Sequence, residues 1–257
     1  MRRTFGRGRA ISLFSLGTMR ALGSADQMTE VVEAAVQAEI NHLETAPAYG
    51  PAEDFLGQAL QRSRRRPDGG WVITSKLLPG ISFEQGQRQL RGILERLQCE
   101  RLDNLAVHGL NRPEHLHWAE KGEGRALLEW AMESNLVDQV GFSSHGSQRL
   151  IAEALDVELF TFCSLHLHLL DPQRLPLARR ALDRGMGVLA ISPADKGGRL
   201  QAPSAQLIED CWPIAPLELA YRYLLSQGIS SLTVGASQAS DLQLASQLAQ
   251  RCGPLNP

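Results

Sequence analysis

Short apolar runs alternate with longer amphipathic segments along most of the chain. The short runs are typical of buried strands, because a strand covered on both faces of a parallel sheet is almost continuously hydrophobic. Eight such runs predict eight strands, at residues 11–16, 41–45, 71–77, 102–108, 139–143, 159–165, 187–191 and 231–234.

The segments between these runs place apolar residues at spacings of three and four, which predicts helices with one buried face. Strands that alternate with helices indicate repeated βα units around a parallel sheet. Eight units predict a closed (β/α)8 barrel, the TIM barrel, as one domain over residues 1–257. The clearest helical segments are residues 29–38, 82–97, 125–133, 216–226 and 239–250.

An open, doubly wound parallel sheet is the competing architecture. That fold usually binds a dinucleotide through a G-x-G-x-x-G turn after its first strand, and no such turn follows residues 11–16. The stretch RRTFGRGRAISLF, with Gly-Arg-Gly in its middle, predicts a short N-terminal β-hairpin that closes the bottom of the barrel.

Polar side chains stand where the predicted strands end, which is where barrel enzymes carry their catalytic groups. Lys76 interrupts an apolar run and is one of only three lysines in the chain. A buried ammonium is costly unless it is paired, so we expect a partner carboxylate such as Glu44. The strand-end residues are Glu44, Thr45, Tyr49 just beyond, Lys76, His108, Ser143, Ser144, Ser164, His166 and Ser192.

A phenol, an ammonium, a carboxylate and an imidazole at one mouth form an acid–base set. The ammonium favours the phenolate, which predicts a pKa of Tyr49 below its usual value of about 10. Tyr49 is then the predicted general acid, with Lys76 held by Glu44, and His108 orients a carbonyl oxygen. A lone strand-end histidine is more often structural, so the combination carries the prediction.

Several motifs resemble the aldo-keto reductase family: NHLETAPAYGPAEDFLGQAL, VITSKL, DNLAVHGLN, VGFSSHG, ISPADKGGRL and SLTVGAS. The resemblance implies an oxidoreductase that reduces an aldehyde or ketone with hydride from NAD(P)H while Tyr49 protonates the oxygen. It also implies roles for Lys76 as the pKa modulator and for His108 as the group that orients the carbonyl. Glu44 holds a position that is more often Asp, and its additional methylene leaves the geometry of the ion pair open.

The same resemblance implies a coenzyme in the barrel mouth. Ser143 and Ser144 stand where the family has Ser and Asn for the nicotinamide amide, and Ser164 stands at or beside the usual Gln. Ile191 replaces an aromatic ring that stacks on the nicotinamide. Ser237 stands where many members have a basic residue for the 2′-phosphate, so NADP is expected and NAD remains open.

Further residues are expected to contact the coenzyme. The glycines of the SPADKGG loop permit close backbone approach to a pyrophosphate, and the loop after the last strand leads into a helix whose amides suit a phosphate. These candidates are Gly17, Thr18, Met19, His166, Ser192, Pro193, Ala194, Lys196, Gly197, Gly198, Gly235, Ser237 and Asp241.

The motifs are most similar to a branch of predicted oxidoreductases whose longer members carry a cysteine-rich, ferredoxin-like C-terminal region. The four cysteines of this chain are widely spaced, so we expect neither an iron–sulfur cluster nor a zinc site, and the thiols are expected to be unpaired. His115 and His117 stand two residues apart in a predicted loop without a third ligand. No metal site is therefore predicted.

Composition excludes several classes. The formal net charge of −2 gives no basic excess for nucleic acid or an anionic membrane surface. The start MRRTFGRGRA lacks the apolar stretch of a signal peptide, and no run approaches the roughly 20 apolar residues of a membrane span. We expect a cytoplasmic enzyme whose partner is a small carbonyl compound; the sequence is silent on oligomeric state.

Three departures in the expected coenzyme pocket, at Ser144, Ile191 and Ser237, support an alternative function. In that alternative, the barrel binds NADP(H) as a regulatory or interaction protein and turns over little.

Overall fold

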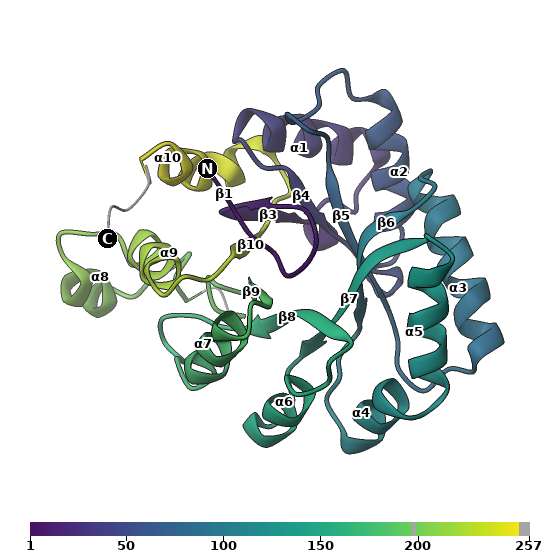
Figure 1. Ribbon diagram of the computed structural model, residues 1–257. Coiled ribbons are helices and arrows are strands. Elements are labelled where there is room, and N and C mark those ends of the chain that lie inside the picture. Colours follow the sequence, from purple (N-terminus) through teal and green to yellow (C-terminus); the bar gives the residue numbers. More distant parts are fainter. Residues whose placement is uncertain (197–198, 252–257) are drawn as a thin grey trace.

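The computed structural model describes residues 1–196 and 199–251, which form a closed parallel barrel (Figure 1). Neighbouring strands follow the order β10-β3-β4-β5-β6-β7-β8-β9, so the predicted (β/α)8 barrel is confirmed. The barrel strands are β3 (Phe14–Gly17), β4 (His42–Glu44), β5 (Val72–Leu77), β6 (Leu102–Val107), β7 (Val137–Ser144), β8 (Phe160–His166), β9 (Gly187–Ile191) and β10 (Ser231–Gly235).

Helices surround the barrel and connect its strands (Figure 1). The start of α3 is specified locally: the Ser82 hydroxyl accepts from the Gln85 amide, and the Gln85 side chain accepts from the Ser82 amide. The helices are α1 (Ala25–Gln37), α2 (Ala52–Arg62), α3 (Phe83–Leu97), α4 (Pro113–Glu120), α5 (Glu123–Glu133), α6 (Gln148–Ala154), α7 (Leu175–Asp183), α8 (Ala205–Cys211), α9 (Pro216–Ser226), α10 (Gln243–Arg251), η1 (Thr18–Arg20), η2 (Pro47–Tyr49) and η3 (Ala239–Leu242).

The predicted N-terminal hairpin is confirmed, and it divides the first predicted strand. β1 (Arg2–Arg3) pairs antiparallel with β2 (Ile11–Ser12), and the barrel strand β3 begins only at Phe14. Between the two short strands, Phe5 is fully buried in the barrel interior against Phe162. A Cβ on Gly187 would lie 2.4 Å from the Phe5 ring, so glycine is required there.

The expected loop around His115 and His117 is instead helix α4, so that prediction was wrong. Pro113 occupies the first turn, where its fixed φ favours a helix start. Trp118 is buried, and its indole N–H donates to the Ile81 carbonyl at 2.8 Å, which anchors the helix. Polar residues on the outer face had concealed the helical periodicity.

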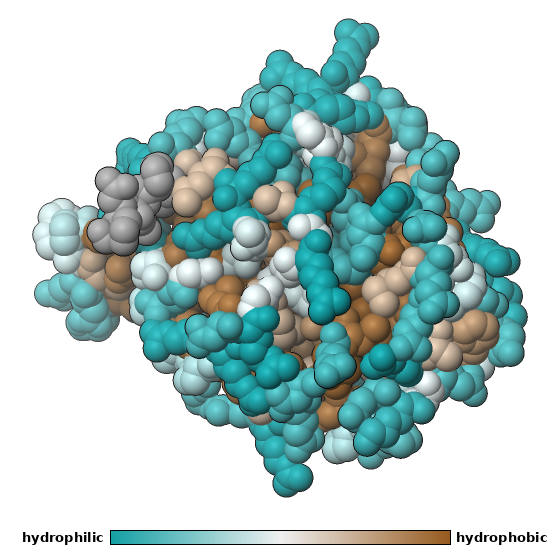
Figure 2. All heavy atoms as spheres, in the orientation of Figure 1, coloured by the Kyte–Doolittle hydropathy of each residue, from teal (hydrophilic) through white to brown (hydrophobic). Residues whose placement is uncertain are grey.

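On the face shown in Figure 2, hydrophilic side chains cover most of the rim, and hydrophobic side chains are exposed between them. No helix within the two described ranges is long and apolar enough to cross a membrane.

A buried polar layer crosses the barrel at His42 on β4. Its Nδ1 lies 2.6 Å from the Ser15 hydroxyl and its Nε2 lies 2.7 Å from the Thr74 hydroxyl. Burial and, to a smaller extent, the charge of Lys76 lower the pKa of His42 to about 3. The imidazole is therefore neutral in the folded protein at neutral pH.

We expect this histidine to make the fold acid-sensitive. The unfolded chain binds a proton at His42 below about pH 6.5 and the folded chain does not, so stability is full above that pH and falls as the pH drops toward 3. Between pH 6.5 and 5 the loss is about 2 kcal/mol. Urea unfolding of the wild type and His42→Gln at both pH values measures it, and equal pH dependence in the two proteins would contradict it.

Candidate active site

Three of the predicted residues meet at the C-terminal ends of β4 and β5. Lys76, 2% exposed, forms a buried ion pair with Glu44. Its Nζ also donates to the Tyr49 hydroxyl at 2.7 Å and to the Thr45 carbonyl at 3.0 Å. The Tyr49 hydroxyl in turn donates to Glu44 Oε1 at 3.0 Å. Phenol, ammonium and carboxylate thus form one closed network, and the additional methylene of Glu44 preserves the ion pair.

Local sequence explains this convergence. β4 ends at Glu44, and the single turn η2 begins at Pro47 and ends at Tyr49, where Gly50 reverses the chain with φ of 63°. Gly17, on the neighbouring strand, packs closely against Thr233 and lies next to the carboxylate. A Cβ there would lie 2.7 Å from Thr233 Cγ2 and 3.5 Å from Glu44 Oε2.

His108 follows β6 and borders the same network. Its backbone amide donates to the Leu77 carbonyl at 2.7 Å, which fixes the residue beside the end of β5. The ring stands perpendicular to Tyr49, with 5.9 Å between centroids. Burial, followed by the charges of Lys76 and His145, lowers the pKa of His108 to about 4. The neutral ring can therefore donate one hydrogen bond toward the mouth at neutral pH.

The predicted acidity of Tyr49 is corrected by the structure. Burial raises the pKa of Tyr49 to about 12, and burial lowers the pKa of Lys76 well below its ordinary value. Burial disfavours the charged phenolate, and this cost outweighs the attraction of the neighbouring Lys76. Tyr49 is consequently protonated at neutral pH, as a proton donor must be.

The serines of β7 and β8 occupy a neighbouring part of the mouth. Ser143 and Ser164 are paired across the two strands, and both are buried. The Ser164 hydroxyl and His166 Nε2 are buried without a hydrogen-bond partner among residues 1–196 and 199–251. The Ser144 hydroxyl instead donates to the Leu110 carbonyl at 2.6 Å and accepts from the Gly146 amide at 3.0 Å, so it braces two loops.

The residues that follow β3 differ in exposure: some are buried and structural, and others face the solvent. Thr18 is fully buried and its hydroxyl donates to the Thr45 hydroxyl at 2.9 Å, which ties η1 to the end of β4. Met19 is 59% exposed, and Leu78, just past β5, is 53% exposed. These two apolar side chains are available to a bound molecule, whereas the Thr18 side chain is not.

The loop after β9 contains two positive φ angles, a backbone conformation that residues other than glycine rarely adopt. Ser192 has φ of 53° and Asp195 has φ of 68°, and the Asp195 amide donates to the Ser192 carbonyl at 3.0 Å. Of the predicted residues in between, Pro193 and Ala194 are buried, and Lys196 beyond them is exposed. Gly197 and Gly198 lie outside the described residues.

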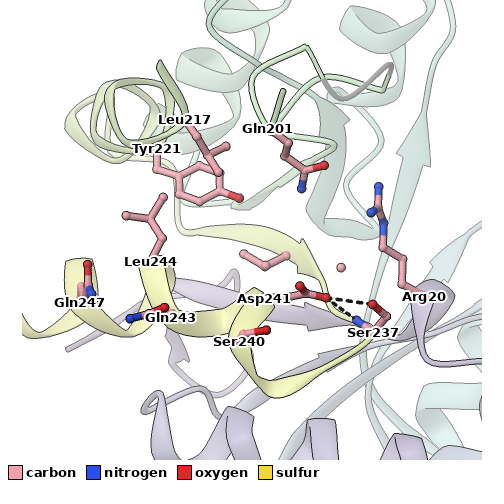
Figure 3. A pocket seen from close by; sticks show the side chains of 12 residues that line it. Arg20, Gln201, Leu217, Tyr221, Ser237, Ser240, Asp241, Gln243, Leu244 and Gln247 are labelled. Atoms are coloured by element: carbon pink, nitrogen blue, oxygen red, sulfur yellow. Dashed lines mark hydrogen bonds between the residues drawn. The ribbon is translucent and has the colours of Figure 1, made fainter. Parts of the chain in front are cut away.

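A pocket of about 590 Å³ lies beside β10, lined from η1, α9, η3 and α10 (Figure 3). Arg20, Asp241, Tyr221 and Gly235 are among the residues that line it. Asp241 Oδ2 accepts from the Ser237 amide at 2.8 Å and from its hydroxyl at 3.0 Å. Ser237 lies in the loop whose helix N-terminus was expected to offer amides to a phosphate, and its own amide is already bonded to a carboxylate.

Sequence reasoning missed Arg20, His145 and Tyr221. Arg20 follows Met19 directly, and His145 follows β7 directly, with its ring 5.5 Å from that of His166. Both could have been found by extending each strand end one or two residues. Tyr221 lies within α9, where its apolar neighbours indicate only a buried face.

The closed barrel, with a tyrosine, lysine, glutamate and histidine together at one end, is the architecture of a barrel oxidoreductase. The model of the aldo/keto reductase family matches residues 14–250. The chain belongs to this family.

Known relatives agree with this assignment. The chain is 28% identical over 208 residues to an aldo-keto reductase of Mycolicibacterium vanbaalenii, covering 77% of this chain and 69% of the relative. It is 26% identical over 219 residues to the uncharacterized oxidoreductase YrpG of Bacillus subtilis, covering 74% and 65%. The holo form of aldo-keto reductase AKR11C1 from Bacillus halodurans has the same fold, with a TM-score of 0.83, 19% identity and 99% and 92% coverage.

Proposed function

We propose that this protein reduces an aldehyde or ketone with hydride from NAD(P)H and that Tyr49 is the general acid. One observation carries the proposal: the buried Tyr49 hydroxyl lies 2.7 Å from Lys76 Nζ and 3.0 Å from Glu44 Oε1, next to a neutral His108. A protonated phenol beside an ammonium is a proton donor whose conjugate base is stabilised as it forms.

Each side chain then has a defined task. A nicotinamide coenzyme supplies the hydride when it is bound. Tyr49 donates its proton to the substrate oxygen, and Lys76 stabilises the phenolate that remains. Glu44 holds the ammonium in position, and His108 donates a hydrogen bond that orients the carbonyl oxygen.

The described residues fit a nicotinamide coenzyme. The buried Ser164 hydroxyl, without a partner in the described chain, and Ser143 beside it would bind the carboxamide. Ile191 on β9 would provide an aliphatic contact in place of an aromatic stack. The pocket that Arg20 and Asp241 line would hold the adenosine half, with the Arg20 guanidinium as the cation for a phosphate.

A coenzyme and substrate panel tests this function. Fluorescence titration with NADPH and NADH, followed by turnover with aldehydes and ketones, is expected to give binding and coenzyme oxidation. Binding without turnover on any carbonyl would instead indicate the regulatory alternative. If the protein neither bound nor oxidised a coenzyme, both functions would be overturned. The alternative finds no support in the comparisons, whose relatives are a reductase and an oxidoreductase.

NADP remains the proposed coenzyme, and Asp241 is expected to weaken the binding of NADP relative to that of NAD. The Asp241 carboxylate faces the pocket that would hold a 2′-phosphate. Asp241→Asn keeps an acceptor for Ser237 and removes the charge. The Kd for NADPH should fall roughly fivefold, since a partly exposed charge contact is worth about 1 kcal/mol, while the Kd for NADH should hardly change.

Fluorescence titration of both coenzymes measures this effect. Ser240→Ala, which changes a neutral side chain of the same pocket, is the matched control. An equal change for NADH and NADPH would contradict a contact between Asp241 and the 2′-phosphate.

A further inference from the structure

A second cluster of chemically active side chains lies at the end of β8, apart from the Tyr49 network. His166, His168 and Asp171 each bring one ligand atom within 4.8 Å of the others. The chain turns back after β8, so that His168 and Asp171 form an isolated antiparallel bridge and the Asp171 amide donates to the His168 carbonyl at 3.1 Å. The backbone itself thus holds the three side chains together.

Two nitrogens of this cluster have unsatisfied bonding capacity. His166 Nε2 and His168 Nδ1 are buried and have no hydrogen-bond partner in the described part of the chain. His168 is only 3% exposed. A buried polar atom without a partner is costly and rare in folded proteins, which indicates that something else binds there.

The carboxylate of Asp195 lies on the Nε2 side of His168. Its Oδ1 is 3.6 Å from His168 Nε2, longer than a hydrogen bond, so it acts through its negative charge, which favours the proton on Nε2 and the lone pair on Nδ1. Metal-binding histidines are usually oriented in this way, by a carboxylate on the nitrogen that does not bind the metal. Asp195 is itself held by Arg199, whose Nε donates to Oδ2 at 2.7 Å.

We propose that His166, His168 and Asp171 form a binding site for a divalent transition metal ion, with Zn²⁺ as the ion that suits these donors. Two imidazole nitrogens and one carboxylate are a common zinc ligand set, and three protein ligands leave a fourth position for water or another molecule. Asp171 is 34% exposed, which provides the path for the ion. Zinc bonds of about 2.0–2.2 Å place ligands about 3.4 Å apart, so small side-chain rotations close the site.

Arg174 is the competing cation. One of its terminal nitrogens lies 3.9 Å from Asp171 Oδ2, and another donates to the carbonyls of His145 and Gly146 at 3.3 Å each. The arginine is therefore anchored to the loop after β7, and its distance from Asp171 exceeds a hydrogen bond. Metal binding requires only that Arg174 and Asp171 move further apart. We therefore expect the Arg174→Gln variant to bind the ion more tightly than the wild type.

Cobalt is the probe for this site. The full chain, treated with EDTA and then freed of the chelator, is titrated with CoCl2 while visible absorption is recorded. We expect one equivalent of Co²⁺ with the intense absorption of a four-coordinate ion, and displacement by Zn²⁺. This readout does not depend on reductase activity, so it fails or succeeds independently of the proposed function.

Variants assign the ligands. His168→Gln and Asp171→Asn should each weaken Co²⁺ binding at least tenfold, and Asp195→Asn should weaken it about tenfold through the orientation of His168. His117→Gln, an exposed histidine on α4, is the control and should bind as the wild type does. If His168→Gln does not fold, the partly exposed Asp171→Asn variant decides the question.

Two outcomes would overturn the site. One is a titration of the wild type without saturable visible absorption. The other is saturable binding that Asp171→Asn and Asp195→Asn leave unchanged, since the ion would then lie elsewhere.

Discussion

Tyr49→Phe is expected to lower kcat by roughly 10²- to 10⁴-fold, the contribution of a positioned general acid. The substitution removes only the hydroxyl that lies 2.7 Å from Lys76 Nζ and 3.0 Å from Glu44 Oε1. Lys76 and Glu44 remain paired with each other, so the fold and the coenzyme affinity should be nearly unchanged. Steady-state kinetics on the best carbonyl substrate, with a coenzyme titration, separate these quantities.

Tyr223→Phe on α9 provides the matched control, because it removes a phenol hydroxyl far along the chain from the network. It should retain wild-type kcat. A Tyr49→Phe variant with wild-type kcat would remove the phenol from the mechanism.

The second large effect concerns Lys76→Met, which should abolish turnover and destabilise the fold by about 3–5 kcal/mol. The loss in stability arises because the Glu44 carboxylate, 4% exposed, would be left in the interior without its counter-charge. Lys76→Met/Glu44→Gln should recover much of the stability, because neither side chain is then charged, but none of the activity.

Urea unfolding of the wild type, both single variants and the double variant forms a double-mutant cycle that measures the coupling. We expect the double variant to lose less stability than the sum of the losses in the two single variants. Additive losses in the double variant would show that the buried ion pair does not determine stability here.

The strands were predictable because burial on both faces leaves a continuous apolar signal. The run at residues 187–191 coincides with β9. The strand predicted at residues 11–16 is wrong only in being a single strand, because the hairpin strand β2 ends and β3 begins within it. Helix α4 escaped prediction because its buried face is carried by few residues, Leu116 and Trp118 among them, within a polar segment. Periodicity is weak evidence when a helix is only two turns long.

The network at Tyr49 was predictable because a lysine inside an apolar strand requires a counter-ion. The pKa of Tyr49 was not predictable, because it depends on how deeply the phenol is buried in the folded protein. The role of Ser144 in bracing a loop and that of Asp241 in binding the Ser237 amide also depend on loop geometry. Residue types at strand ends indicate a site, but the hydrogen bonds among loops determine which groups face a ligand.

The hairpin has a practical consequence for handling the protein. Phe5 and the packed side chains of the barrel interior close one end, so molecules reach Tyr49 through the opposite opening, at the C-terminal ends of the strands. Attaching the protein to a solid support through Met1, which is 43% exposed, should leave that opening directed at the solution. A biosensor or immobilised reactor made in this orientation should retain the turnover of the free enzyme.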